Sequence, residues 1–183
     1  MRNVLAFSVW AIACEPALAV CPVVDENDPR RADLLDQVRL APNEGAAQLI
    51  TNQLWEIWAT APDAHAQELL DEGLQRRRVG DLEGAYAAFD ALVAYCPVYA
   101  EGYNQRAFVA FIRQDYDQAL TDLNRAIDLA PDHFAAIAGR ALTEIGLGRN
   151  DVAQDTLKQA LRLNPWLPER RFLSKDATPG TEL

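Results

Sequence analysis

Apolar residues recur at spacings of three and four along most of this 183-residue chain, which is the pattern of amphipathic helices. The pattern is clearest over residues 100–133, where a turn near Gln114 separates two such helices and Pro131 ends the second. The same layout occurs 34 residues earlier, over 66–99, and 34 residues later, over 134–167, and the three units align without a gap. A fixed period in this range indicates a stacked array of helix pairs.

Small residues and prolines hold fixed places within these units. The eighth, twentieth and twenty-seventh positions are mostly Gly or Ala, which would let neighbouring helices approach to about 8–10 Å. A proline at the thirty-second position would end each second helix. The residues, in unit order, are Gly73, Ala107 and Ala141 at position eight, and Ala85, Ala119 and Ala153 at position twenty. Position twenty-four holds Phe89, Leu123 and Leu157, position twenty-seven holds Leu92, Ala126 and Ala160, and position thirty-two holds Pro97, Pro131 and Pro165. The larger Leu92 predicts a slightly wider first junction.

This combination of sites, recurring together three times, resembles the tetratricopeptide repeat (TPR) family over residues 66–167. The resemblance implies an all-α fold, a right-handed solenoid of helical hairpins in which residues 66–99, 100–133 and 134–167 are the repeats. It also implies a concave groove lined by the first helix of each repeat.

The inner turns of the units predict a special backbone conformation. Gly80 and Gly148 mark these turns in the first and third units, and Gln114 takes the same place in the second. A left-handed conformation at Gln114 would cost about 1 kcal/mol, because its Cβ is crowded there and glycine has none.

The segments on either side of the repeats are predicted to cap the array, since each end of a stack leaves an apolar face bare. Residues 31–65 are predicted to form a degenerate helix pair that covers the first repeat. Its Trp55 and Trp58 would form either a ligand platform or part of the core, and we favour a core position for at least one of them. Residues 168–173 are predicted to form a short capping helix, and 174–183 a disordered tail.

Residues 1–19 are expected to be a signal peptide. Arg2 precedes an apolar run that is shorter than the roughly 20 residues of a membrane-spanning helix, and residues 17–19 fit a signal-peptidase site. Cleavage there would export the chain, with a linker over 20–30 and no membrane insertion, to the periplasm. The alternatives are a frayed cytosolic N-terminus and lipid attachment at Cys14, around which the match to a lipobox is poor.

Removal of residues 1–19 would leave two cysteines, Cys21 and Cys96. An even count in an oxidising compartment makes a disulfide between them one interpretation. The other interpretation is that Cys96 is a small buried apolar residue.

Charge and motifs restrict the function classes. The formal net charge of −10 argues against nucleic acids and anionic membrane surfaces as partners. The chain has no HExxH motif, phosphate loop or glycine-rich dinucleotide motif. His65 and His133 lie two repeats apart, which at about 8–10 Å per layer is too far to share a metal ion. We therefore expect no enzyme activity, no metal and no cofactor.

Recurrent arginines allow two interpretations. Arg106 and Arg140 share the seventh position of their units. They would form either an anion site or a ladder of ion pairs, for example Arg106 with Asp122, and we favour the ladder because a buried arginine needs a partner. The basic run at residues 76–78 would offset a helix dipole or receive an acidic peptide.

The resemblance also places the groove-facing positions of each unit. These candidate partner-binding residues are Leu70, Leu74, Arg77, Glu101, Asn104, Gln105, Phe108, Phe111 and Leu142. Leu70 and Leu74 stand where one branch of the family has the lysine and asparagine that grip C-terminal carboxylates, so receptors for Hsp70 or Hsp90 tails are disfavoured. The groove is predicted to be apolar, with Asn104 and Gln105 able to hydrogen-bond a peptide backbone.

These patterns predict a non-enzymatic scaffold or adaptor of the bacterial cell envelope. It would bind an extended or helical segment of a protein or peptide partner in the groove, as a monomer or weak homo-oligomer. The alternatives are a self-associating structural repeat protein and an enzyme or metal-binding protein of unfamiliar type.

Overall fold

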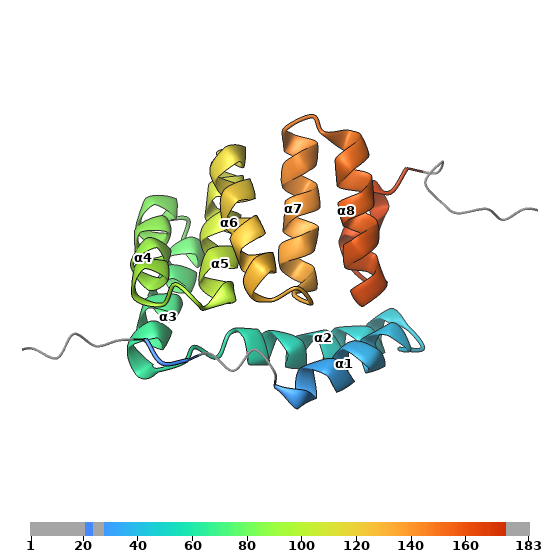
Figure 1. The fold of residues 1–183 in the computed structure, drawn as a ribbon, viewed down its shortest axis with the longest axis horizontal. Helices are drawn as coiled ribbons and strands as arrows, with labels where there is room; N and C mark the ends of the chain where they lie inside the picture. The colour runs from blue at the N-terminus through green and yellow to red at the C-terminus, as the bar shows by residue number, and fades with distance from the viewer. Residues whose placement is uncertain (1–20, 24–27, 175–183) are drawn as a thin grey trace, which may run out of the picture.

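The computed structural model describes residues 21–23 and 28–174. These residues form eight α-helices, a short 3-10 helix and no strand (Figure 1). The elements are α1 (Pro29–Arg39), α2 (Glu44–Trp58), α3 (Ala64–Arg78), α4 (Leu82–Tyr95), α5 (Ala100–Ile112), α6 (Tyr116–Leu129), α7 (Phe134–Gly146), α8 (Asn150–Leu163) and the 3-10 helix η1 (Pro168–Phe172). The prediction of an all-α helical-repeat fold is confirmed, and the predicted signal peptide lies outside the described residues.

Helices α3 to α8 form three hairpins that stand side by side (Figure 1). Polar residues begin most of these helices by accepting a hydrogen bond from a free backbone N–H group. Asp63 caps α3 through the N–H of Ala66, at 2.8 Å, and Asp81 caps α4 through that of Gly84, at 2.9 Å. The helix boundaries thus follow from local sequence.

Small residues allow the close packing that the repeat pattern predicted. Ala85, Ala107 and Ala119 are each fully buried. A Cβ atom added to Gly73 would lie 2.3 Å from the ring of Phe89, so this position of the first hairpin accepts only glycine.

The inner turns have the expected left-handed backbone. The φ angles are 83° at Gly80, 61° at Gln114 and 74° at Gly148. Gln114 is the one non-glycine residue with positive φ among the described residues. Its side chain is exposed.

The position of α1 and α2 corrects one prediction. The pair does not cover the first repeat but runs beneath the array, along the ends of α5 to α8 (Figure 1). Leu35 and Leu54 lie in one buried cluster with Ile137 of α7 and Ala160 of α8. The side chain of Asn164 donates a hydrogen bond to Thr51, 113 residues earlier, at 3.2 Å.

The charge on the outer face of α3 explains this arrangement. Glu68, Glu72 and Arg76 are exposed there, so the first repeat already ends in a polar surface. The apolar stripe of α2 finds more apolar area against the third repeat, where Phe134 and Ile137 are buried.

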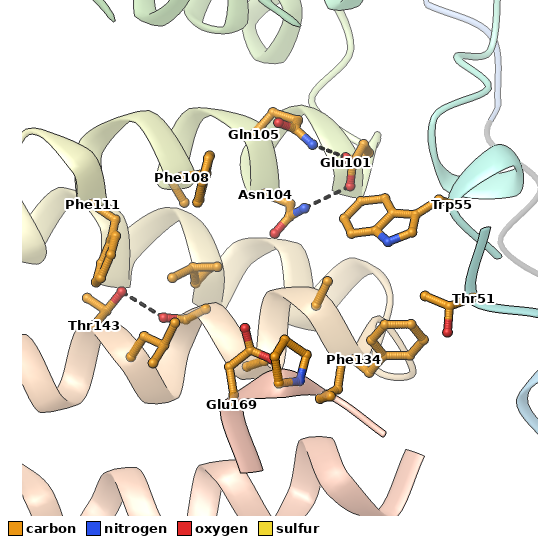
Figure 2. Close-up of a pocket in the computed structure, with 18 of the residues that line it drawn as sticks. Thr51, Trp55, Glu101, Asn104, Gln105, Phe108, Phe111, Phe134, Thr143 and Glu169 are labelled. Atoms are coloured by element: carbon orange, nitrogen blue, oxygen red, sulfur yellow. Dashed lines mark hydrogen bonds between the residues drawn. The ribbon is translucent and has the colours of Figure 1, made fainter. Parts of the chain in front are cut away.

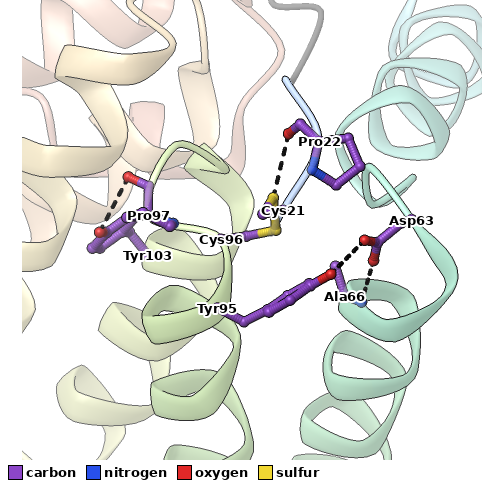
Figure 3. The surroundings of a disulfide bond; sticks show 8 residues. All are labelled: Cys21, Pro22, Asp63, Ala66, Tyr95, Cys96, Pro97 and Tyr103. Atoms are coloured by element: carbon purple, nitrogen blue, oxygen red, sulfur yellow. Dashed lines mark hydrogen bonds between the residues drawn. A yellow bond between two sulfur atoms is a disulfide. The ribbon is translucent and has the colours of Figure 1, made fainter. Parts of the chain in front are cut away.

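A disulfide between Cys21 and Cys96 ties the start of the described chain to the end of α4 (Figure 3). Their Cα atoms lie 5.1 Å apart, and Cys96 is fully buried. Cys96 is therefore both a disulfide partner and a buried core residue, two interpretations that the sequence left as alternatives. Beside it, the hydroxyl of Tyr95 donates to Asp63 at 2.7 Å. The N–H of Ala66 and this hydroxyl hold the pKa of the Asp63 carboxyl below its usual value.

The C-terminal capping segment is a 3-10 helix over residues 168–172. Leu167 and Trp166, just before it, pack into the cluster of α1, α2 and α7. Ser174 was predicted to begin a disordered tail, but its N–H donates to the Gln154 side chain at 2.8 Å. The rest of the predicted tail, 175–183, lies outside the described residues.

We expect Gln114→Gly to raise the free energy of unfolding by about 1 kcal/mol, because glycine adopts positive φ without steric cost. Urea unfolding followed by circular dichroism measures this. Arg113→Gly is the matched control, since Arg113 has a φ of −76° and gains nothing from glycine. Arg113→Gly should lower the stability, because it also removes the ion pair with Glu83. A Gln114→Gly variant no more stable than the wild type would contradict the strain assigned to Gln114.

We expect Cys21→Ala to lower the free energy of unfolding by about 2–4 kcal/mol under oxidising conditions, because the disulfide closes a loop between residues 75 apart. The double variant Cys21→Ala/Cys96→Ala should lose little more than the single variant. A wild-type protein whose stability does not change on reduction would count against the bond.

Candidate binding groove

A groove of about 550 Å³ lies between the first helices of the three repeats, α3, α5 and α7 (Figure 2). This volume is in the usual range of ligand-binding clefts. Helix α2 contributes Thr51 and Trp55 to its lining, and the segment before and within η1 contributes Leu167 and Glu169. The unexpected course of α2 therefore helps to shape the groove.

Most of the predicted groove residues line it. They are Leu74, Arg77, Glu101, Asn104, Gln105, Phe108, Phe111 and Leu142. Leu70 is the exception and corrects the prediction. It is fully buried in a cluster with Ala66 and Phe89, because its position on α3 faces the second helix of its own repeat.

Several lining residues were missed by the sequence prediction. Trp58 lies in the core, as favoured for at least one of the two tryptophans, and Trp55, absent from the predicted groove residues, is half-buried and lines the groove. Phe134 and Thr143 of α7 line the groove as well. Phe134 could have been predicted, because it is an aromatic residue at the first position of the third repeat. Trp55 could not, because it reaches the groove only through the course of α2 beneath the array.

Aromatic and aliphatic side chains form one part of the groove. Phe108 is 47% exposed, which is unusual for a phenylalanine on a helix that is otherwise largely buried. Phe111, one turn further along α5, packs against Tyr116 with ring centroids 5.6 Å apart. Phe108 is therefore the more available of the two aromatic anchors.

A buried hydrogen bond joins α5 and α7 at the base of the groove. His133 Nε2 lies 2.8 Å from Glu101 Oε2, and the two side chains are 0% and 2% exposed. His133 Nδ1 accepts the N–H of Ala136 and so caps α7. Because Nδ1 is an acceptor, Nε2 carries the proton and donates it to the Glu101 carboxylate.

The ring of His133 also fixes α2. It stacks on the indole of Trp58 with centroids 4.0 Å apart, and it meets the ring of Trp55 edge to face with centroids 6.0 Å apart. Tyr99, which precedes α5, donates to the backbone carbonyl of Trp58 at 2.5 Å. One buried pair thus holds α2, α5 and α7 together.

Glu101 orients the two amide side chains of the groove (Figure 2). Asn104 Nδ2 donates to it at 2.9 Å, and Gln105 Nε2 donates to its other oxygen. A carboxylate accepts hydrogen bonds only, so the amide oxygens must point away from it. The oxygen of Gln105 accepts from Arg77, while that of Asn104 has no partner within the described residues.

The recurrent arginines outside the groove form structural ion pairs. Arg106 lies between Asp122 at 2.7 Å and Asp90 at 2.5 Å, and its bond to Asp122 raises its pKa. Arg140 lies 3.9 Å from Glu144, and it also donates to Gln159 at 3.2 Å. The contacts of Arg106 join neighbouring helices as the predicted ladder would, whereas Arg140 and Glu144 lie one turn apart on the same helix, α7.

The described residues provide no metal cluster and no membrane-spanning helix. In residues 21–23 and 28–174, no three His, Cys, Asp or Glu side chains are grouped to hold a metal ion. Within the same ranges, no helix is both long and apolar enough to cross a bilayer.

We expect His133→Ala to lower the free energy of unfolding by about 3–5 kcal/mol, because Glu101 would stay buried without its main donor. Urea unfolding of the variant measures this. The control is His65→Ala, since His65 is exposed and its removal should change stability by less than about 0.5 kcal/mol. Similar losses in both variants would contradict the role given to the buried pair.

Comparison with known proteins agrees with this fold. Residues 100–133 match the model of the tetratricopeptide repeat family. Tetratricopeptide repeat protein 36 homolog of Nematostella vectensis is 38% identical over 73 residues, which are 40% of each chain. A TPR repeat-containing protein of Rhizobium etli is 26% identical over 139 residues, or 74% of this chain and 67% of that protein. The chain thus spans less than half of the Nematostella relative.

Among solved structures, the second TPR domain of human RPAP3, in complex with an HSP70 peptide, is 25% identical. The superposition has a TM-score of 0.58 and covers 62% of this chain and 96% of the domain. The chain is therefore similar to the tetratricopeptide repeat family at residues 100–133 and has the all-α helical-repeat fold of TPR domains.

Proposed function

We propose that this protein is a non-enzymatic interaction scaffold or adaptor that holds a segment of a partner protein in the groove between α3, α5 and α7. The observation that carries the proposal is the 47% exposed Phe108, which stands on the wall of a groove of about 550 Å³. Exposed aromatic side chains in a concave apolar surface supply most of the affinity in many protein interfaces.

The comparisons support this class of function. The RPAP3 domain is in complex with an HSP70 peptide, so a domain of this fold has a peptide partner. The partner of the present chain would differ, because Leu70 is buried and Leu74 lines the groove where the family's carboxylate-gripping lysine and asparagine would stand. An apolar segment, extended or helical, fits the aromatic groove better.

The proposed setting is the bacterial cell envelope, reached by export to the periplasm after cleavage of residues 1–19. The signal-peptide pattern of that segment supports the proposal. The disulfide between Cys21 and Cys96 supports it too, because such bonds persist in oxidising compartments. Lipid attachment at Cys14 is the alternative form of export.

Self-association by end-to-end stacking receives less support. The outward face of α3 carries the exposed Glu68, Glu72 and Arg76. Stacking of a second copy on this end would remove charges from water. We therefore favour a monomer that binds a different protein.

We expect Phe108→Glu to abolish binding of apolar peptides and to leave the helix content unchanged, because the side chain is exposed and its charge would enter the groove. Peptides selected from a displayed random library on the wild-type protein are the probes, and fluorescence anisotropy measures their dissociation constants. Circular dichroism checks the fold of each variant.

The matched control is Val152→Glu on α8, which is similarly exposed, at 54%, but does not line the groove. It should bind the selected peptides as the wild type does. A folded Phe108→Glu variant with unchanged affinity would place the binding surface elsewhere.

A further inference from the structure

Four arginines in the described part of the chain are half-buried, and they differ in their partners. Arg31, Arg106 and Arg140 each lie within 4.0 Å of a carboxylate, at 2.8, 2.7 and 3.9 Å. Arg77 makes no ion pair with any described residue, although removal of an arginine from water is costly when no anion compensates it. It is also the one cationic side chain among the residues that line the groove.

Arg77 is held in place by a hydrogen bond to a neutral amide and by an aromatic ring, with no carboxylate in direct contact. Its guanidinium donates to the amide oxygen of Gln105 and lies 4.8 Å from the ring centroid of Phe108. Burial lowers its pKa, whereas pairing with Asp122 raises that of Arg106. The Glu101 carboxylate attracts Arg77 through space and opposes this lowering of its pKa, but it makes no ion pair with Arg77 and already accepts hydrogen bonds from His133, Asn104 and Gln105.

The neighbours of Arg77 in the basic run have different surroundings. Arg76 is exposed and pairs with Glu72 and Asp81, at 2.8 and 2.9 Å. Arg78 is exposed and donates to Gln75 at 2.8 Å. Only Arg77 enters the groove, so of the two interpretations of residues 76–78, reception of an acidic peptide can apply to this residue alone.

We infer that Arg77 selects a partner segment in which an acidic side chain, Asp or Glu, lies beside the apolar residue that packs on Phe108. This inference rests on the proposed function of the groove and names the chemistry of its occupant. The acidic side chain would supply the carboxylate that Arg77 lacks, as a charge-assisted and geometrically specific contact. Because Arg77 touches Phe108, the acid and the apolar anchor must be close neighbours in the partner.

Asn104 offers a second contact to the same segment. Its side chain is 7% exposed, and its oxygen, directed away from Glu101, has no partner within residues 21–23 and 28–174. Asn104 and Phe108 are one helical turn apart on α5 and so lie on one face. A backbone N–H of the bound segment next to the apolar anchor would satisfy this acceptor.

The net charge of the protein makes the preference diagnostic. At −10, the chain repels acidic peptides at long range. A preference for an acidic ligand would therefore have to come from a local contact.

The test uses three peptides, acetylated and amidated so that they carry no terminal charge. Each has a central Leu-Phe-Leu flanked on both sides by Glu, by Gln or by Lys. Anisotropy should show that the wild type binds the Glu peptide about tenfold more tightly than the Gln peptide. Arg77→Gln should remove this preference, and Arg77→Glu should transfer it to the Lys peptide.

Arg78→Gln and Arg78→Glu are the matched controls, because Arg78 is the adjacent arginine outside the groove, and both should keep the preference for the Glu peptide. If the wild type binds the three peptides equally while Phe108→Glu abolishes binding, the inference is overturned and the groove assignment stands. The same holds if the preference survives in Arg77→Gln. If the wild type binds none of the three, both the inference and the proposed function are contradicted.

Discussion

The hydrogen bond between His133 and Glu101 lies in the interior, where α2, α5 and α7 meet. A buried carboxylate is tolerated only when its acceptor capacity is used, and Glu101 uses it on His133, Asn104 and Gln105. Each bond has a consequence elsewhere. His133 also caps α7 and stacks on Trp58 of α2. The bonds from Asn104 and Gln105 to Glu101 set which atoms of these two side chains face the groove.

The repeat array could be predicted from sequence because its determinants are local and recur. The small residues, the prolines and the left-handed turn at Gln114 each act within one unit or between adjacent ones. The place of α1 and α2 could not be predicted in this way, since a helix pair before a repeat array is expected to stack on the first unit. The charged residues Glu68 and Glu72 on α3 were a readable sign against that stacking.

The groove was predictable where it depends on the repeat and unpredictable where other elements enter it. Phe108 and Asn104 line it because their positions in the unit face inward. Trp55 and Glu169 line it because α2 and η1 close around it, which no period in the sequence specifies. The spacing of His133 from His65 argued against a shared metal site, but the role of His133 as a structural donor depends on a carboxylate 32 residues away.

The packing of Trp58 against His133 places α2 beneath the array and beside the groove. Nuclear Overhauser measurements on the wild-type protein test it without any substitution. With ring centroids 4.0 Å apart, the protons of the Trp58 indole and the His133 imidazole should give strong cross-peaks. Cross-peaks from Trp58 to Leu69 of α3, with none to His133, would show that α2 stacks on the first repeat and would contradict the account.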